Sequence, residues 1–421
     1  MKVLSSHCDN GKWIETKNTP EETAISQRDT EKEEIKRVLS DAFRCKNLVI
    51  LTGLGASLHV NCNKDTKDTR TPENGKKIAP TMGDLWDKSM AKSAGNFEKI
   101  LAASRFPENE ADKKNIEALL SYCKIAAEFI ELPDKDVIDT FVSDTEKIIR
   151  DEINFLETDN NLPVHAELLR RIARRSNRKI RTKIFTTNYD LCFEYAARKG
   201  RYVVIDGFSH TSPQVFDSIN FSYDIVKRES HPESHDYISN VFHLYKLHGS
   251  IDWEKNETTK EIKRVQKTKK PVLIYPRNTK YELAFEQPYL EMMSAFQTAL
   301  RQPETALLVV GFGFNDSHLA EPIISAIRSN LNLRVVICDP ALAPRGEAKG
   351  ATESNEYLKD IAYLIAQGDA RLSLINATFE EMVPYLPDIV AETDLEQHLD
   401  RLRKLREESG NSKAREVPHD S

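Results

Sequence analysis

Three side chains that could take part in catalysis stand directly after short apolar runs of the sequence. Asn188 and Asp190 belong to the string Phe-Thr-Thr-Asn-Tyr-Asp, and His248 belongs to the string Tyr-Lys-Leu-His-Gly. A histidine titrates near neutral pH and can act as a general base, whereas an amide or a carboxylate can orient a substrate or stabilise a cation. Each residue also has a structural alternative, because Asn and Asp cap helices and isolated histidines are often structural.

Two glycine turns follow two other apolar runs, and both could approach a nucleotide. The first turn contains Gly53, Gly55, Ala56 and Ser57, and the second contains Gly311 and Gly313 ahead of Asn315 and Asp316. Glycine lets peptide N–H groups approach a phosphate closely. A further apolar run ends at Asp339, where an acid can reach a ribose hydroxyl. The third glycine of the usual dinucleotide fingerprint is missing, so ordinary turns and helix caps explain the same pattern.

The elements that must position these residues are strands that alternate with helices. Seven short apolar runs lie between helical stretches, near 183–186, 202–205, 242–247, 272–275, 306–310, 334–337 and 371–375. Such alternation predicts an α/β fold with a parallel sheet covered by helices on both faces. Ligands of such sheets bind at the carboxyl ends of the strands, where the residues named above are expected.

The rest of the chain divides by composition and periodicity. We expect a flexible N-terminal segment at 1–29, a main domain at 30–386 and a charged C-terminal helix and tail at 387–421. Within the main domain, helical periodicity at about 97–176 predicts an inserted helical subdomain. The polar stretch 59–80 is a candidate lid or disordered loop, and 254–270 is expected to form an exposed hairpin.

Composition narrows the class of protein. The 421 residues carry a net charge of −6, which argues against direct nucleic-acid binding by the chain as a whole. The six cysteines include no Cys-x-x-Cys pair, so we expect reduced thiols and no metal site. No apolar run is long enough to cross a membrane, and the N-terminus lacks the apolar core of a secretion signal. These features predict a cytoplasmic protein.

The order of the four strand-end motifs resembles the sirtuin family. The motifs follow one another in the order Gly-x-Gly-Ala-x-Ser, Thr-x-Asn-x-Asp, His-Gly and Gly-x-Gly. The resemblance covers roughly residues 45–60 and 180–385. In this sequence the first motif, Gly53 to Ser57, reads Gly-Leu-Gly-Ala-Ser. The resemblance implies a Rossmann-like parallel sheet that binds NAD. It assigns the dinucleotide phosphates to Gly53, Gly55, Ala56 and Ser57.

The resemblance also assigns roles at the other strand ends. Asn188 is similar to the family's asparagine near the nicotinamide ribose, Asp190 to the acid that shapes the nicotinamide pocket, and His248 to the catalytic histidine. Gly311, Gly313 and Asn315 are similar to the turn facing the adenosine half. Thr187 stands where the family usually has glutamine, and we expect it to contact the nucleotide as well.

Two departures from the family pattern change the expected activity. Residues 249–337 contain no cysteine, so no zinc ribbon with thiolate ligands can form there. The family's Pro-Asp-Phe-Arg lid is also missing, and 80–86 is the candidate replacement. Because deacetylases of the family use the zinc module in their peptide cleft, the chain is more similar to bacterial sirtuin-like NAD hydrolases of antiphage defence. The resemblance therefore implies NAD as substrate, no zinc, and NAD depletion as the effect.

Two other functions stay open at this stage. One is an NAD-dependent protein deacylase with the same nucleotide pocket, and the other is a non-catalytic nucleotide- or nucleic-acid-binding subunit, which the basic run 260–270 motivates. Because an unregulated NAD hydrolase would kill its host, we expect control by homo-oligomerisation or a partner. By resemblance, the first choice of partner is a HerA-type hexameric ATPase and the second is an Argonaute-like protein.

Overall fold

The computed structural model describes most of the chain. The described residues are 1–8, 12–15, 23–63, 70–93, 95–157, 160–175, 180–228, 235–266, 268, 270–273, 287–345 and 348–388. The expected C-terminal helix and tail lie outside them, apart from Pro387 and Asp388. None of the described helices has the length and apolar character needed to cross a membrane.

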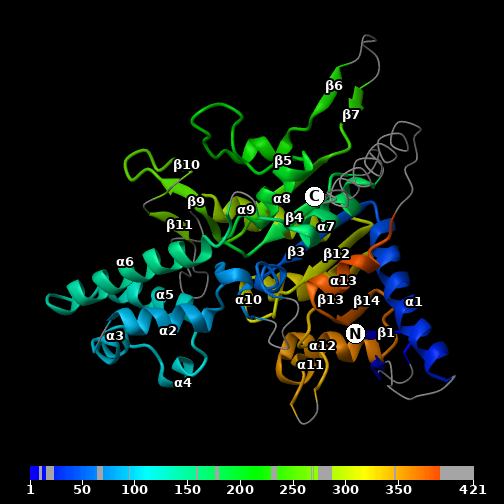
Figure 1. Ribbon diagram of the computed structural model, residues 1–421, viewed down its shortest axis with the longest axis horizontal. Helices are drawn as coiled ribbons and strands as arrows, with labels where there is room; N and C mark the ends of the chain where they lie inside the picture. The colour runs from blue at the N-terminus through cyan, green and yellow to red at the C-terminus, as the bar shows by residue number, and fades with distance from the viewer. Residues whose placement is uncertain are drawn as a thin grey trace, which may run out of the picture.

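The described strands build a mixed, mostly parallel sheet in the order β2-β1-β14-β13-β12-β3-β4-β8-β5 (Figure 1). Their bounds are β1 Lys2–Ser5, β2 Ile14–Glu15, β3 Asn47–Thr52, β4 Lys183–Thr186, β5 Val203–Ile205, β8 Val241–Lys246, β12 Thr305–Val310, β13 Leu333–Cys338 and β14 Leu372–Asn376. Only β1 pairs in antiparallel fashion, with β14 on one side and β2 on the other. In the middle, β3 pairs with β12 and β4, so strands from distant parts of the sequence adjoin.

Helices cover both faces of this sheet, which confirms the predicted fold class. One face carries α1 Thr23–Arg44, α7 Pro163–Ala173, α8 Cys192–Gly200 and α13 Phe379–Met382 with the turn Val383–Tyr385; the other carries α9 Tyr289–Arg301, α10 Ser317–Ser329, α11 Ala351–Ser354 and α12 Glu356–Ala366. Side chains of one strand alternate between the faces, so Ile50 enters the first apolar cluster and Leu51 the second. Both faces of β3 are buried, which explains its continuous apolar run.

A second lobe lies beside the sheet and contains the inserted helices. These are α2 Met82–Ser93, α3 Phe97–Ala103, α4 Glu108–Ala111, α5 Ile116–Ala126 and α6 Asp134–Ile153 (Figure 1). They share a third apolar cluster, to which Ile251 and Leu273 of a small antiparallel sheet also belong. That sheet consists of β9 Gly249–Lys255, β10 Ile262–Arg264 and β11 Pro271–Leu273, and a separate hairpin consists of β6 Val226–Arg228 and β7 His235–Tyr237.

Buried charges hold the small sheet against the large one. Arg264 of β10 lies 2.7 Å from the carboxylate of Asp206, which follows β5, and 3.2 Å from that of Asp252 on β9. The same guanidinium lies over the ring of Phe208 at 4.4 Å. The expected hairpin therefore exists as β9 and β10, but it is fixed by an arginine with two carboxylates and is not simply a solvated ribbon.

Three expectations about element boundaries were wrong. The segment 1–29 is not uniformly flexible, because β1 and β2 extend the sheet and α1 begins at Thr23. The inserted helices span α2 to α6 instead of 97–176, because α7 packs on the large sheet. The run 272–275 does not add a parallel strand, since β11 belongs to the small sheet and 274–275 lie outside the described residues.

The two glycine turns pack backbone against backbone. The N–H of Gly55 donates to the carbonyl of Gly311 at 3.0 Å, and a Cβ added at Gly311 would lie 2.5 Å from the Cα of Gly55. Gly311 has a φ of +61°, a conformation that residues with a Cβ adopt only with strain. Glycine is therefore required here by the contact between β3 and β12, whatever ligand binds nearby.

We expect Gly311→Ala to lower the free energy of unfolding by more than about 3 kcal/mol, since strain and a backbone clash add. Gly368→Ala is the matched control, because Gly368 has a φ of +94° but no atom within 4 Å of its added Cβ. That change should cost only about 1 kcal/mol. Denaturant unfolding measures both, and equal losses would contradict the packing argument.

Candidate active site

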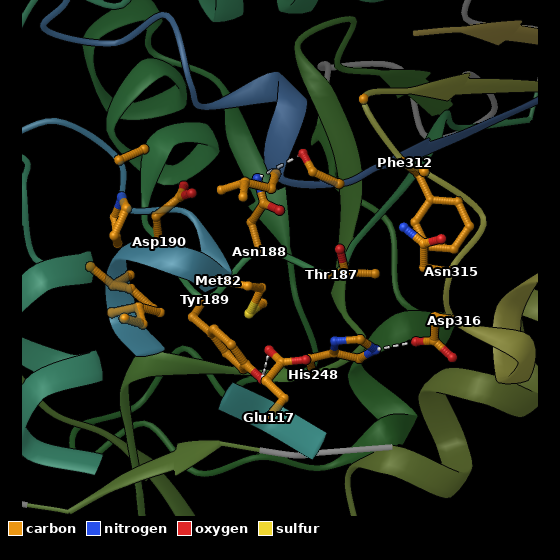
Figure 2. Close-up of a pocket in the computed structure, with 18 of the residues that line it drawn as sticks. Met82, Glu117, Thr187, Asn188, Tyr189, Asp190, His248, Phe312, Asn315 and Asp316 are labelled. Atoms are coloured by element: carbon orange, nitrogen blue, oxygen red, sulfur yellow. Dashed lines mark hydrogen bonds and ion pairs between the residues drawn. The ribbon is translucent and has the colours of Figure 1, made fainter. Parts of the chain in front are cut away.

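The segments that follow β12, β3, β4 and β8 lie next to one another at one edge of the sheet, because these strands are neighbours in that order. They border a cavity of about 280 Å³, near the lower end of the range for ligand sites. Figure 2 shows Asn188, Asp190, His248 and Asn315 around it. The sequence-predicted residues that line the cavity are Gly53, Thr187, Asn188, Asp190, His248, Gly311, Gly313 and Asn315.

Four predicted residues do not line this cavity. These are Gly55, Ala56, Ser57 and Asp339, and Asp339 follows β13, where its carboxylate accepts the N–H of Ala341 at 2.8 Å. Burial raises the pKa of Asp339, with the Ala341 N–H and Arg345 acting against the shift. A ribose contact by Asp339 therefore stays a prediction.

The first glycine turn does not offer a free phosphate cradle in this conformation. The N–H groups of Gly53, Gly55, Ala56 and Ser57 all donate to carbonyls, namely those of Val310, Gly311, Gly53 and Leu54. These four N–H groups are therefore not free for a phosphate in this conformation, and the assignment of the phosphates to these residues stays a prediction. The turn instead supplies packing, a carbonyl and a hydroxyl that fix the neighbouring loop.

Asn188 is held in one orientation by a chain of hydrogen bonds. Its amide Nδ2 donates to the carbonyl of Gly53 at 3.0 Å and to Ser57 Oγ at 2.9 Å, and Ser57 Oγ donates to Asp190 Oδ2 at 2.7 Å. Because Ser57 gives its proton to a carboxylate, it must accept from the amide, which settles which end of the amide is nitrogen. The amide oxygen of Asn188 is left to meet a ligand.

Asp190 serves two purposes. Its second oxygen, Oδ1, accepts the N–H of Cys192, the first residue of α8, at 3.0 Å, although the N-cap position itself is Leu191. Its Oδ2 closes the chain from Asn188 through Ser57. One carboxylate therefore contacts both the start of α8 and the chain that holds Asn188.

His248 is paired with an acid from another strand end. It follows β8, is buried, and its Nε2 lies 3.2 Å from Asp316 Oδ2, within ion-pair distance but not aligned as a hydrogen bond. Burial works against the imidazolium, but the interactions with Asp316 and the charge of Glu117 outweigh it and raise the pKa of His248. Gly249 follows His248 with a φ of +89°. Glycine is required at this position, because an added Cβ would lie 2.1 Å from the carbonyl oxygen of Val272.

Lys246 fixes the loop that carries Asn188. Its ammonium is buried at the end of β8 and donates to the carbonyl of Tyr189 at 3.3 Å, to the carbonyl of Asp190, and to Glu194 Oε1 at 3.1 Å. An ammonium has three donors, so each has an acceptor here. The loop between β4 and α8 is thereby tied to β8, the strand that precedes His248.

Sequence reasoning missed Glu117 and Lys246, and it missed the partner of Asp316. Asp316 was expected to be a helix cap or a partner of a ribose or phosphate, and it does cap α10, since it accepts the N–H of His318 at 3.0 Å; its approach to His248 depends on the sheet order. Glu117 lies in the first turn of α5, far from any strand-end motif, and no sequence signal marks it. Lys246 lies within the run that predicts β8, and its acceptors come from the segment between β4 and α8 and from α8 itself.

The charges around the cavity favour a cation. Among the residues that the structure describes, the lining contains Glu117, Asp190 and Asp316 but no lysine or arginine, and His248 is the one basic side chain. Carboxylates set among largely apolar side chains stabilise positive charge and disfavour a bare anion. Within the described part of the chain, no group of three or more His, Cys, Asp or Glu side chains is placed to hold a metal ion.

We expect Lys246→Met to lower the free energy of unfolding by about 3 kcal/mol at neutral pH, because it leaves Glu194 and two carbonyls without their partner. Burial already raises the pKa of Glu194, and Lys246 acts against that shift. A carboxyl with a raised folded-state pKa destabilises the fold above that pKa, so the loss should shrink as the pH falls through it. Lys199→Met, at an exposed position of α8, is the control; pH-dependent unfolding measures both.

Comparisons with known proteins give one family match and two distant structural matches. Residues 182–361 match the family model described as a SIR2-like domain. A solved structure described as the structural basis for the mechanism and regulation of Sir2 enzymes is 14% identical, with a TM-score of 0.37, and the match covers 88% of this chain and 99% of that chain.

A second solved structure is a histidine-to-alanine variant of Sir2 with a deacetylated p53 peptide and 3′-O-acetyl ADP-ribose; it is 11% identical, with a TM-score of 0.36, over 84% of this chain and 96% of that chain. No curated protein matches the chain significantly. The chain therefore has a Rossmann-type α/β fold, and over residues 182–361 it is similar to the SIR2-like domain.

Proposed function

We propose that the protein is an NAD⁺ hydrolase that cleaves the nicotinamide–ribose bond and releases nicotinamide and ADP-ribose. The observation that carries the proposal is the meeting of Asn188 and His248 in one cavity, where the other charged groups from the described part of the chain are carboxylates. The match of residues 182–361 to the SIR2-like domain supports NAD as the substrate class.

The chemistry needs stabilised positive charge more than a strong nucleophile. When the bond to the positively charged nicotinamide breaks, the ribose takes on oxocarbenium character, as in glycoside cleavage. Asp190, Asp316 and Glu117 supply negative charge around the cavity, and it is already in place before the bond breaks. Their arrangement also suits the cationic end of NAD⁺ in the ground state.

The remaining steps fall to the amide and the imidazole. The oxygen of Asn188 can orient a ribose hydroxyl or the attacking water, because both amide hydrogens are already bound. His248, when neutral, accepts the proton that the water or hydroxyl loses, and Asp316 stabilises the resulting imidazolium. Water adds to the anomeric carbon as nicotinamide leaves, so atoms and charge balance without another reactant.

A protein deacylase would use the same cavity, and the chain's similarity to the SIR2-like domain is compatible with it. The two activities differ in what they need. A hydrolase forms ADP-ribose from NAD⁺ and water alone, whereas a deacylase requires an acyl-lysine peptide. Mass spectrometry of the products with and without such a peptide therefore separates them, and NAD⁺ that stays intact unless peptide is present would overturn the hydrolase.

The biological setting is part of the same proposal. We propose that NAD⁺ loss serves antiphage defence, that the chain acts as a homo-oligomer, and that a HerA-type hexameric ATPase controls it. An Argonaute-like protein is the second choice of partner. Support comes from the resemblance of the motifs in the sequence, and co-purification of the chain with its genomic neighbour is the direct test.

Asn188→Ala and His248→Ala should each lower the rate of NAD⁺ cleavage by at least about 100-fold while the protein stays folded. The exposed His210 provides the control, and His210→Ala should keep full activity. Quantifying ADP-ribose by mass spectrometry, with circular dichroism for folding, measures the effect. Undiminished turnover in either site variant would exclude the assigned role.

Asp316→Asn should move the acid limb of the pH–rate profile to lower pH and reduce the maximal rate. The carboxylate helps to raise the pKa of His248 against the opposing effect of burial, so its loss lets the imidazole become neutral at lower pH. The same loss weakens the base and removes the group that balances the imidazolium. An acid limb at an unchanged pH would show that His248 is not the titrating base.

A further inference from the structure

The inserted helices contribute to the wall of the cavity. Asn115 and Glu117 stand at the start of α5, and Ile153 and Phe155 stand at and beyond the end of α6; all four line the cavity opposite the strand ends. The site thus lies between two lobes, and its geometry depends on how the inserted helices pack against the sheet.

One hydrogen bond joins the insertion to the loop that carries Asn188. The hydroxyl of Tyr189 donates to Glu117 Oε1 at 2.8 Å, and the Tyr189 side chain is buried. The backbone of the same residue is held from the opposite side, because its carbonyl accepts from Lys246 and from the N–H of Ile251 at 3.2 Å. Tyr189 therefore connects the insertion with the sheet and adjoins Asn188 along the chain.

The same contact reaches His248. The rings of Tyr189 and His248 lie 6.3 Å apart between centroids at 45°, and Figure 2 shows Glu117 beside both. The charged groups that face His248 are Asp316 from the start of α10 and Glu117 from α5. Tyr289 and His318 in turn interact with Asp316, so they belong to the same electrostatic group.

We propose that Glu117, through Tyr189, is a positioning residue by which the helical insertion sets His248 and the Asn188 loop for NAD⁺ cleavage. This rests on the proposed function. If α5 shifted relative to the sheet, the Glu117 carboxylate would move away from His248. The same shift would break the hydrogen bond to Tyr189, which adjoins Asn188. Activity would then depend on the insertion, although the insertion supplies no residue that reacts.

Packing alone does not explain a carboxylate at this position. The insertion already has its own apolar core, in which Leu119, Leu120, Ile138 and Ile149 are fully buried or nearly so. A half-buried carboxylate costs free energy unless it is matched by donors, and one donor here is Tyr189, from the loop that carries Asn188. Glu117 is therefore placed to act on the site.

Glu117→Gln tests the charge while leaving an acceptor for Tyr189. We expect the ring protons of His248, followed by NMR in the free protein, to titrate at lower pH in Glu117→Gln than in the wild type. The acid limb of the NAD⁺ cleavage profile should shift in the same direction. Glu128→Gln, at an exposed acid just beyond the other end of α5, is the matched control and should change neither.

The hydrogen bond is tested by a double-mutant cycle. Tyr189→Phe and Glu117→Ala should each lower kcat about fivefold with little change in KM, as expected for loss of one hydrogen bond. The combined variant should lose no more than the worse single variant, because both changes break the same contact.

Two results would overturn the proposal. One is a His248 titration in Glu117→Gln identical to that of the wild type, or one matched by Glu128→Gln. The other is full multiplication of the two kcat losses in the cycle. A folded wild-type protein that cleaves no NAD⁺ would refute the proposed function alone, because the NMR titration still decides whether Glu117 acts on His248.

Discussion

The contact on which the rest of the structure depends is the backbone packing of the two glycine turns after β3 and β12. Each turn excludes a Cβ from the other, with Gly55 and Gly311 in direct contact. This closeness lets the carbonyl of Gly53 and the hydroxyl of Ser57 receive the amide of Asn188, which follows the next strand. The orientation of Asn188 is therefore a consequence of two turns that have no side chains to separate them.

Electrostatics gives the site its chemical character. Among the described residues, three carboxylates and one histidine line the cavity, while the buried Lys246 donates to carbonyls and to Glu194. The buried positive charge of Lys246 thus positions the loop that carries Asn188, whereas the charged side chains that face the ligand are mainly negative. Such a distribution suits a reaction in which positive charge moves from a leaving pyridinium to a ribose.

The sequence was sufficient to predict the parallel sheet and the part of the cavity formed by the strand ends. Alternation of short apolar runs with helical periods locates β3, β4, β8 and β12, and a parallel sheet brings their carboxyl ends together, so Asn188 and His248 could be predicted to meet. What remained hidden depends on contacts between distant segments. Glu117 reaches the site because an inserted lobe folds over it, and no local pattern records that.

The errors have similar causes. The strand β1 is short, and its burial comes from pairing with β14 at the far end of the sequence, so its own composition resembles a flexible segment. The first glycine turn has the residues of a phosphate loop, but its N–H groups are taken by carbonyls, some of them from β12 and the turn that follows it. Local motifs predict where a strand ends more reliably than what the following backbone donates to.

The pairing of β3 with β12 has a consequence for biosynthesis. Leu51 lies opposite Val309 in the sheet, so β3 can pair with β12 only after the ribosome has synthesised a strand that lies far later in the sequence. A nascent chain that has already produced Asn188 and His248 still lacks Gly311, Phe312 and Asp316. The cavity can therefore close only after residue 316 has been synthesised, so a nascent chain that stops before that point has no complete site.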